Sequence, residues 1–165
     1  MNHEIGFGGG CYWCTEAVFQ ALRGVQHVEQ GFMRSSPPDD AWSEAVIVHF
    51  DPAEIDLVDL IDVHLHTHAS TSPHSMRDKY RSAIYCNSPQ QAREPNAILS
   101  EMQDTFSEPL VTRVLSRVDF KSSESKSQNY FNKNSSNQFC ERYIEPMLEK
   151  LRDEYSHLIV DSEPI

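Results

Sequence analysis

The spacing of apolar residues predicts a strand, a helix and two more strands within the first fifty residues. Residues 4–7 have the composition of a short strand, which a glycine run separates from the next element. Residues 15–22 show helical spacing, and Gly24 stands where the helix is expected to end. Residues 26–33 and 43–50 are predicted strands, and in the second, SEAVIVHF, apolar side chains alternate between two faces.

The rest of the chain continues with helices and strands and then becomes polar. Asp51 followed by proline has the composition of a helix start, with Asp51 as the N-cap, and apolar residues continue to about residue 65. The further elements expected, in order, are a polar loop over 67–79, a strand over 80–86, a helix from Ser88 to about Thr105 that contains Pro95, strands over 110–114 and 118–120, an irregular segment over 122–138, and a helix over 142–158.

This order of elements predicts an α+β fold. We expect helices packed on a small mixed sheet, as a ferredoxin-like two-layer sandwich with an irregular C-terminal tail. No internal repeat or linker divides the sequence, so residues 1–165 are expected to form one domain. Its core would span about 4–120, and its tail about 121–165.

Composition excludes several classes of function. Apolar residues make up 39% of the 165 residues, which is typical of a globular chain. Lys and Arg number 14 against 25 Asp and Glu, and with a formal net charge of −11 the chain is not expected to bind nucleic acid. No apolar run reaches the length of a membrane span, and the first ten residues lack secretory features, so we expect no membrane contact and a cytoplasmic location.

The candidate chemistry is concentrated in GFGGGCYWC, residues 6–14. Cys11 falls at or next to the start of the predicted helix, where free backbone N–H groups and the helix dipole lower the pKa of a thiol. Packing would be the better interpretation of an isolated cysteine, but the glycines, two aromatic residues and a second cysteine favour a reactive thiolate. Four cysteines in a reducing compartment also indicate redox or metal chemistry before structural disulfides: Cys11, Cys14, Cys86 and Cys140.

A metal site is the weakest interpretation of these cysteines. Zinc needs a second ligand pair besides Cys11 and Cys14, and the other two cysteines are single. His64 and His68 share a helical face at i, i+4, but we expect them to be solvent-facing or to cap the helix end. No metal and no other cofactor is therefore expected.

Two thiol mechanisms fit the Cys11-Tyr-Trp-Cys14 motif. A thioredoxin-type pair would use both cysteines, although such motifs tend to carry glycine and proline between them. Alternatively, Cys11 is a single nucleophile, and Tyr12 and Trp13 form an apolar pocket that holds part of a substrate, such as a methyl group. Core packing is the ordinary alternative for both aromatic residues.

Four segments, in order, are similar to one known family. GFGGGCYWCTEAVFQALRGV resembles the GCFWC-type motif of the A-type peptide methionine sulfoxide reductases. SEAVIVHFDP resembles that family's strand with an acidic residue, KYRSAIY resembles its QYRSAIY segment, and SQNYFNKNSSNQFCERYIEP resembles its tail pattern HQDYxxKNPxxPYC. The resemblance covers roughly residues 4–150.

The resemblance implies reduction of the S epimer of methionine sulfoxide, either free or in oxidised proteins. Cys11 would attack the sulfoxide sulfur, and Glu44 would protonate the departing oxygen. Glu44 must then be partly buried to raise its pKa, whereas a solvent-side strand position is the ordinary alternative. Tyr12 and Trp13 would hold the S-methyl group, and Tyr80 would hydrogen-bond the sulfoxide oxygen.

The same resemblance implies a second thiol that regenerates the enzyme. Loss of methionine would leave a sulfenic acid on Cys11, with which another thiol condenses. Cys140, in a tail expected to be mobile, matches the family's resolving position, and Cys14 is the nearer alternative. A thioredoxin-like partner would reduce the disulfide, and Cys86 has no assigned role. A thiol–disulfide oxidoreductase using Cys11 and Cys14, or a metal-binding or redox-sensing module, are the alternative functions.

The chain departs from the family pattern around the expected site. Loop 67–79 is about four residues shorter, and the family's aspartate falls on Ser75, with Asp78 or His74 as replacements. The family's tyrosine in the loop before the acidic strand is missing, and Trp42 is the candidate for its space. We therefore expect the substrate range to differ.

Overall fold

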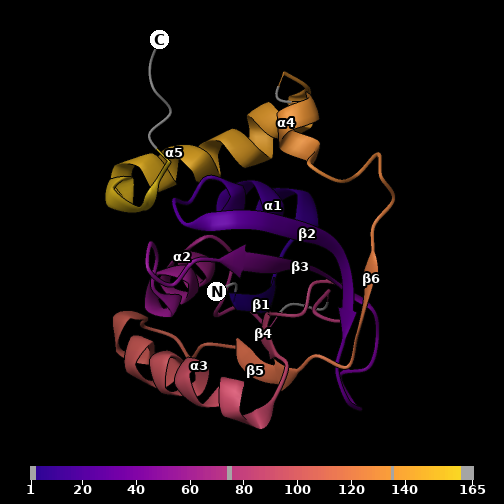
Figure 1. The fold of residues 1–165 in the computed structure, drawn as a ribbon, viewed down its shortest axis with the longest axis vertical. Coiled ribbons are helices and arrows are strands. Elements are labelled where there is room, and N and C mark those ends of the chain that lie inside the picture. The colour runs from indigo at the N-terminus through magenta and orange to yellow at the C-terminus, as the bar shows by residue number, and fades with distance from the viewer. Residues whose placement is uncertain (1–2, 74–75, 135, 161–165) are drawn as a thin grey trace.

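The computed structural model describes residues 3–73, 76–134 and 136–160. Within these ranges, strands form one mixed sheet in the order β5-β4-β1-β3-β2-β6 (Figure 1). The strands are β1 (His3–Gly8), β2 (Val25–Arg34), β3 (Ser43–Phe50), β4 (Ala83–Cys86), β5 (Arg113–Ser116) and β6 (Asp119–Ser122). The central β4-β1-β3-β2 strands pair antiparallel, which is the ferredoxin-like order, while β5 pairs parallel with β4. The predicted α+β sandwich is confirmed.

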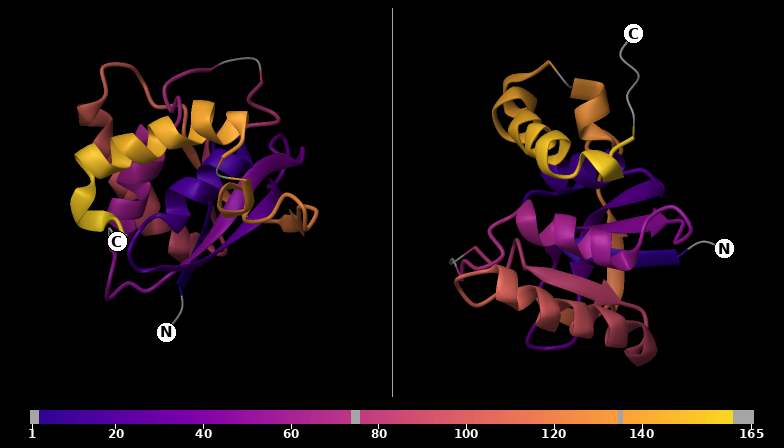
Figure 2. Two further views of the ribbon diagram at one scale, coloured as in Figure 1. Left: turned by 90° about the horizontal axis from the view of Figure 1, so that it is seen from above. Right: turned by 90° about the vertical axis from the view of Figure 1, so that its left-hand side faces the viewer.

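The α-helices of the described residues and the sheet enclose the main core. They are α1 (Tyr12–Gln20), α2 (Leu57–His66), α3 (Pro89–Met102), α4 (Tyr130–Asn134) and α5 (Glu145–Glu154). Buried Phe7 of β1 stacks on Phe19 of α1, and Val46 and Val48 of β3 belong to the same cluster. α5 lies across α1 (Figure 2). No helix in these ranges has the length and apolar content to cross a bilayer.

Period-two alternation along β3 decides which side chains meet the helices. Val46 and Val48 face the main core, whereas Ala45 and Ile47 belong to a smaller cluster on the other face of the sheet. Glu44 has the same parity as Val46, so it points to the helix side, where α1 begins. The predicted bounds and faces of this strand are confirmed.

Several predicted element bounds are wrong for local reasons. α2 begins at Leu57 with Asp56 as its N-cap, because Asp51 instead forms a turn in which its carboxylate accepts the Ala53 N–H at 2.9 Å. β4 begins at Ala83 instead of residue 80, since the Arg81 N–H is bonded to the Ser43 hydroxyl at 2.7 Å. β5 and β6 both begin later than predicted, at Arg113 and Asp119. α3 runs through Pro95 as predicted.

The C-terminal segment is packed on the fold, so the expectation of a loose, mobile tail is wrong. After the irregular residues 123–129 come α4, a π-helical turn (Cys140–Ile144) and α5. Cys140, Ile144 and Leu151 are each 0% exposed and belong to the main core. That the whole of 1–165 is a single domain stays a prediction.

A buried carboxylate fastens the tail to α1. Glu16 is 1% exposed and accepts the backbone N–H groups of Asn129 at 2.8 Å and Tyr130 at 3.1 Å. The side chain of Gln30, on β2, donates to the same carboxylate at 2.8 Å and to the Ser127 carbonyl at 2.9 Å. The position of the tail is therefore set by hydrogen bonds as well as by apolar packing.

Candidate active site

Cys11 is the N-cap residue of α1. Its carbonyl accepts the backbone N–H groups of Cys14 and Thr15, each at 3.1 Å, and its side chain is half-buried. The Cys14 thiol donates to the Cys11 sulfur and lowers the pKa of Cys11; burial opposes this, and the backbone N–H groups of Trp13 and Cys14 add to it. The sequence predicted Cys11 at a helix start, although α1 begins three residues earlier than expected.

Cys14 is the hydrogen-bond donor of this cysteine pair. It is 8% exposed, and its hydrogen bond to Cys11, its burial and the nearby charges of Cys11 and Cys140 raise its pKa strongly. The two motif cysteines therefore differ, because Cys11 is stabilised as a thiolate while Cys14 keeps its proton.

Glu44 meets the start of α1 from β3. It is 8% exposed, so it is not the solvent-side strand residue that composition alone would favour. Its carboxylate accepts the Tyr12 N–H at 3.0 Å, and the Lys79 ammonium lies 3.9 Å from its other oxygen. Burial raises the pKa of Glu44, while the Tyr12 N–H and the Lys79 charge act against that rise. A carboxyl whose pKa is raised by burial therefore lies beside the nucleophile candidate.

Tyr12 and Trp13 point to different neighbours. The Tyr12 ring meets Phe32 of β2 edge-on with centroids 5.4 Å apart. Trp13 stacks face to face on Tyr130 of the tail at 3.8 Å and meets Phe139 edge-on at 5.1 Å. One face of Trp13 is therefore covered by the tail, and Tyr12 and Phe32 form the more open aromatic wall.

Tyr80 lies in the turn before β4, not in the strand that was predicted there. The preceding Lys79 carbonyl accepts the Glu44 N–H at 2.8 Å and the Ser43 hydroxyl at 3.0 Å, which fixes this turn against β3. The Lys79 ammonium lies 5.2 Å from the Tyr80 ring centroid, and its hydrogen bond to Tyr80 raises the pKa of Lys79. Lys79 was not singled out from the sequence. The feature that could have pointed to it is that this chain has lysine where the family segment QYRSAIY has glutamine.

Arg77 was also missed, and it joins the glycine turn to the turn that carries Tyr80. Its guanidinium donates to the carbonyls of Gly9 at 3.0 Å, Tyr80 at 2.9 Å and Ser72 at 2.9 Å, and to that of Ala69. Of the residues considered for the family's aspartate, Ser75 and His74 lie outside the described residues, and Asp78 is exposed. A cation bonded to backbone carbonyls therefore organises this altered loop.

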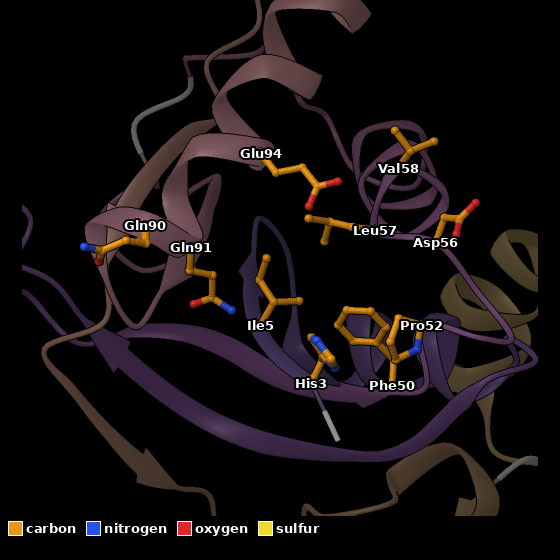
Figure 3. A pocket seen from close by; sticks show the side chains of 10 residues that line it. All are labelled: His3, Ile5, Phe50, Pro52, Asp56, Leu57, Val58, Gln90, Gln91 and Glu94. Atoms are coloured by element: carbon orange, nitrogen blue, oxygen red, sulfur yellow. The ribbon is translucent and has the colours of Figure 1, made fainter. Parts of the chain in front are cut away.

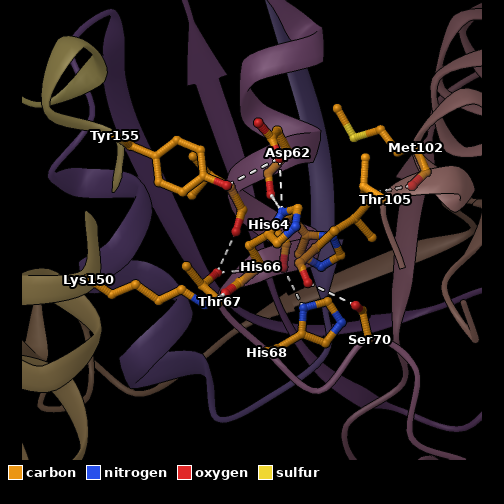
Figure 4. Close-up of polar contacts among 12 residues, drawn as sticks. Asp62, His64, His66, Thr67, His68, Ser70, Met102, Thr105, Lys150 and Tyr155 are labelled. Carbon is orange, nitrogen blue, oxygen red and sulfur yellow. Dashed lines mark hydrogen bonds and ion pairs between the residues drawn. The ribbon is translucent and has the colours of Figure 1, made fainter. Parts of the chain in front are cut away.

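His64 lies in the last turn of α2, and His68 lies in the turn that follows it (Figure 4). His64 is 2% exposed and donates through Nε2 to the Gly8 carbonyl at 2.8 Å, so the prediction that it faces solvent is wrong. His68 donates through Nδ1 to the His64 carbonyl at 2.6 Å, as predicted for a capping residue, and accepts the Ser82 hydroxyl at Nε2. Burial lowers the pKa of His68 to about 4 and that of His64 well below its usual value.

These histidines do not form part of a metal centre in the described ranges. His64 and His68 use ring nitrogens to bond carbonyl and hydroxyl groups of the protein. Within the described residues, no group of three or more His, Cys, Asp or Glu is placed to hold a metal ion.

Cys140 and Cys86 are both buried away from solvent. Cys140 lies on the π-helical turn, its N–H donates to the Asn137 side chain at 2.9 Å, and burial raises the pKa of its thiol. Burial also raises the pKa of Cys86, on β4, to about 11. The structure thus brings Cys11, Cys14 and Glu44 together and holds Cys140 in the core.

A cavity at the other end of β1 lies away from these residues. It measures about 600 Å³ and is lined by ten residues (Figure 3): His3, Ile5, Phe50, Pro52, Asp56, Leu57, Val58, Gln90, Gln91 and Glu94. His3 begins β1, whereas Cys11 follows its other end, so cavity and thiol lie at opposite ends of this strand. None of the predicted site residues lines it, so cavity size does not locate the chemistry here.

The motif, the helix start and the adjacent carboxyl agree with a comparison against known families. The family model described as peptide methionine sulfoxide reductase matches residues 3–158. The chain belongs to this family. It is 34% identical to the peptide methionine sulfoxide reductase MsrA of Trichodesmium erythraeum, an alignment that covers 92% of this chain and 95% of that protein. It is also 34% identical to that of Deinococcus radiodurans, covering 90% and 80%.

Solved structures of the family share the fold. The reduced form of Mxr1 from Saccharomyces cerevisiae aligns with a TM-score of 0.70 at 24% identity, covering 84% of this chain and 89% of Mxr1. Methionine sulfoxide reductase A of Corynebacterium diphtheriae aligns with a TM-score of 0.70 at 23% identity, covering 82% and 76%. Mxr1 in complex with Trx2 aligns with a TM-score of 0.62 at 21% identity, covering 78% and 84%.

Proposed function

We propose that this chain reduces the S epimer of methionine sulfoxide, free or in oxidised proteins, with Cys11 as nucleophile and Glu44 as acid. The observation that carries this proposal is the meeting of two oppositely tuned groups at the start of α1. The pKa of Cys11 is lowered and that of Glu44 is raised, and the Glu44 carboxylate is bonded to the N–H of the residue after Cys11. Attack on sulfur and protonation of oxygen need these two protonation states together.

The proposed first step transfers the oxygen atom from substrate to enzyme. The Cys11 thiolate attacks the sulfoxide sulfur and forms a sulfur–sulfur bond while Glu44 gives its proton to the oxygen. The hydroxyl then passes to the Cys11 sulfur as the sulfur–sulfur bond breaks, so methionine leaves reduced and Cys11 is oxidised to a sulfenic acid. Tyr80 is proposed to hydrogen-bond the oxygen, and Tyr12 and Trp13 to hold the S-methyl group. The edge contact of Tyr12 with Phe32 supports an apolar wall at that position.

The second step forms a disulfide and releases water. We propose Cys140 as the resolving thiol: it is fully buried on the π-helical turn, in the core cluster that includes Cys14 and against which Cys11 packs. Cys14 is the competing candidate, because it already hydrogen-bonds to Cys11. Mass spectrometry after one equivalent of substrate, without reductant, separates them: a Cys11–Cys140 disulfide supports the proposal, and a Cys11–Cys14 disulfide that persists in Cys140→Ser contradicts it.

A thioredoxin-like dithiol is proposed to reduce the final disulfide. Mxr1, which shares this fold, has been solved in complex with Trx2. We further propose the cytoplasm as the location, since a catalytic thiolate and three further free cysteines require a reducing compartment.

An epimer-resolved assay tests the function. Purified protein is mixed with the separate S and R epimers of methionine sulfoxide and dithiothreitol, with Cys11→Ser in parallel. Turnover of the S epimer alone, lost in Cys11→Ser, is expected. Equal turnover by the serine variant would sink the proposal, and disulfide reductase activity that survives Cys140→Ser would favour a Cys11–Cys14 oxidoreductase instead.

A further inference from the structure

Three neighbouring strands place a cation in line with Glu44. In the strand register, Phe32 of β2 is opposite Glu44 of β3 on one side and opposite Lys121 of β6 on the other. Directly opposed residues lie on the same face of a sheet, so these three side chains form a row. Because neighbouring strands are about 4.8 Å apart, the row extends about 10 Å from Glu44 to Lys121.

The Lys121 side chain is held over aromatic rings. Its ammonium lies 5.5 Å from the Phe32 ring centroid and 4.8 Å from that of Trp42. Arg34 lies 5.2 Å from the same Trp42 ring. Cation–π contacts of this kind give a long, exposed side chain a preferred position. Since Phe32 also meets Tyr12, the aromatic surface continues from Lys121 to the residue after Cys11.

The charge of Lys121 is available to a ligand. Within the described ranges no carboxylate forms an ion pair with it, whereas Arg34 is paired with Asp119 at 3.5 Å. Glu124, whose charge raises the pKa of Tyr12, is paired with Lys126 at 3.3 Å. On a chain of net charge −11, an exposed lysine without a carboxylate partner at the edge of the site favours a negatively charged group.

We propose that Lys121 is a specificity residue that binds an aspartate or glutamate of the substrate peptide, two residues from the methionine sulfoxide. Side chains of an extended peptide alternate, so residues two apart face the protein together, about 6.6 Å from each other, and the Lys121 ammonium reaches back over the Phe32 ring toward that position. Phe32 and Trp42 form the apolar floor between the two subsites. This inference rests on the proposed function, since it takes the sulfoxide to lie at Cys11 and Glu44.

Matched peptides test the subsite. Each carries one methionine S-sulfoxide and either Asp or Asn two residues before or after it, and dithiothreitol serves as the reductant so that no protein partner is involved. For wild type we expect kcat/KM to be about two- to fivefold higher with Asp on one side, the range of an exposed ion pair. The preference should shrink in about 0.5 M salt, because exposed charges are screened.

Variants at Lys121 assign the effect. Lys121→Gln should abolish the preference for Asp and leave turnover of the Asn peptide unchanged, and Lys121→Glu should reverse the preference. Arg93→Gln, which removes an exposed cation from α3 near the opposite edge of the sheet, is the charge-matched control and should keep the preference.

Each contrary result has a distinct meaning. Equal turnover of Asp and Asn peptides by wild type, or an equal loss on both in Lys121→Gln, overturns the subsite alone. Absence of turnover on every peptide overturns the proposed function and the subsite with it.

Discussion

The glycine turn after β1 separates two groups of titratable side chains that are bonded in opposite ways. On one side, the Glu44 carboxylate accepts the N–H of Tyr12, the residue after Cys11, and lies 3.9 Å from the ammonium of exposed Lys79. On the other, His64 and His68 are bonded to backbone carbonyls and a hydroxyl at 2.6–2.8 Å. The second group holds the chain through Nε2 of His64 and both ring nitrogens of His68, whereas the sulfur of the half-buried Cys11 can meet a substrate.

This difference shows that a shifted pKa does not by itself identify a catalytic group. Burial lowers the pKa of His68 to about 4, yet its ring nitrogens are occupied within the protein. Cys11 is half-buried and is polarised by Cys14. The two differ in that both ring nitrogens of His68 are bonded within the protein, and each of the following variants tests this difference between the groups.

Glu44→Gln should have the largest effect. Loss of the proton donor should reduce kcat by about a hundredfold or more, as expected for general acid catalysis. Because the Glu44 charge raises the pKa of Cys11, the same variant should move alkylation of Cys11 by iodoacetamide to lower pH. Glu101→Gln, at an exposed position of α3, is the control. Slower alkylation together with lost activity would mean that Glu44 supports the thiol instead of the oxygen.

His68→Gln should change how stability depends on pH. His68 titrates at about 4 in the folded protein and near 6.5 when unfolded, so below pH 6.5 the unfolded state binds the extra proton and stability falls. Between pH 7 and 4.5 this amounts to about 2.4 kcal/mol at 1.36 kcal/mol per pKa unit. Urea unfolding at both pH values should show a loss smaller by that amount in the variant. Raised carboxyl pKa values act in the opposite direction but are common to both proteins, so equal losses would exclude His68 as the cause.

Arg77→Gln should lower both the stability and the activity of the protein, because Arg77 joins the glycine turn to the turn that carries Tyr80. Loss of the bonds to the Gly9 and Tyr80 carbonyls should cost about 1–3 kcal/mol of unfolding free energy and lower kcat severalfold. Arg77→Lys should restore part of the stability, since an ammonium cannot reproduce the forked geometry. If Arg77 acts by placing Tyr80, its effect on kcat should be smaller in a Tyr80→Phe background. An equal effect in both backgrounds would assign Arg77 to folding alone.

Lys79→Gln should have the smallest effect. Lys79 is 56% exposed and lies at the long end of ion-pair distance from Glu44, so kcat/KM should change by no more than about fivefold. Because Lys79 lowers the pKa of Glu44, its removal should raise that pKa and extend activity to higher pH. A pH profile that does not move would show that the two charges are independent.

Much of the arrangement around Cys11 and Glu44 could be predicted from the sequence. The glycine run, the cysteine and the helical spacing are adjacent in the chain, so local rules placed Cys11 at a helix start. Alternation along 43–50 put Glu44 on the face of Val46, although only the structure shows that α1 begins opposite it. The proposal that Glu44 is the acid came from the resemblance to a known family.

The contacts that hold the glycine turn, made by Arg77 and His64, were missed because the bonded residues are distant in sequence. Arg77 binds Gly9 across 68 residues, and His64 binds Gly8 across 56. No periodicity reports such pairs. The tail was expected to be loose because its composition is polar, yet Glu16 binds Asn129 across 113 residues. Polar composition described its surface but not the few buried residues, such as Ile144 and Leu151, that fix it.

The bonds of Glu16 determine which changes the tail can accept. This carboxylate binds backbone N–H groups of Asn129 and Tyr130, so it is indifferent to the identity of the side chains there. A few residues earlier, the Ser123 N–H is bonded to the Gln30 carbonyl, so both ends of the segment between them are fixed. Substitutions at exposed Ser125 and Lys126 should therefore be tolerated, but not at Gln128, whose side chain donates to the Gln30 carbonyl, or at Asn129, whose φ is 55°. An insertion or deletion would shift Tyr130 away from Trp13 and carry Cys140 with it.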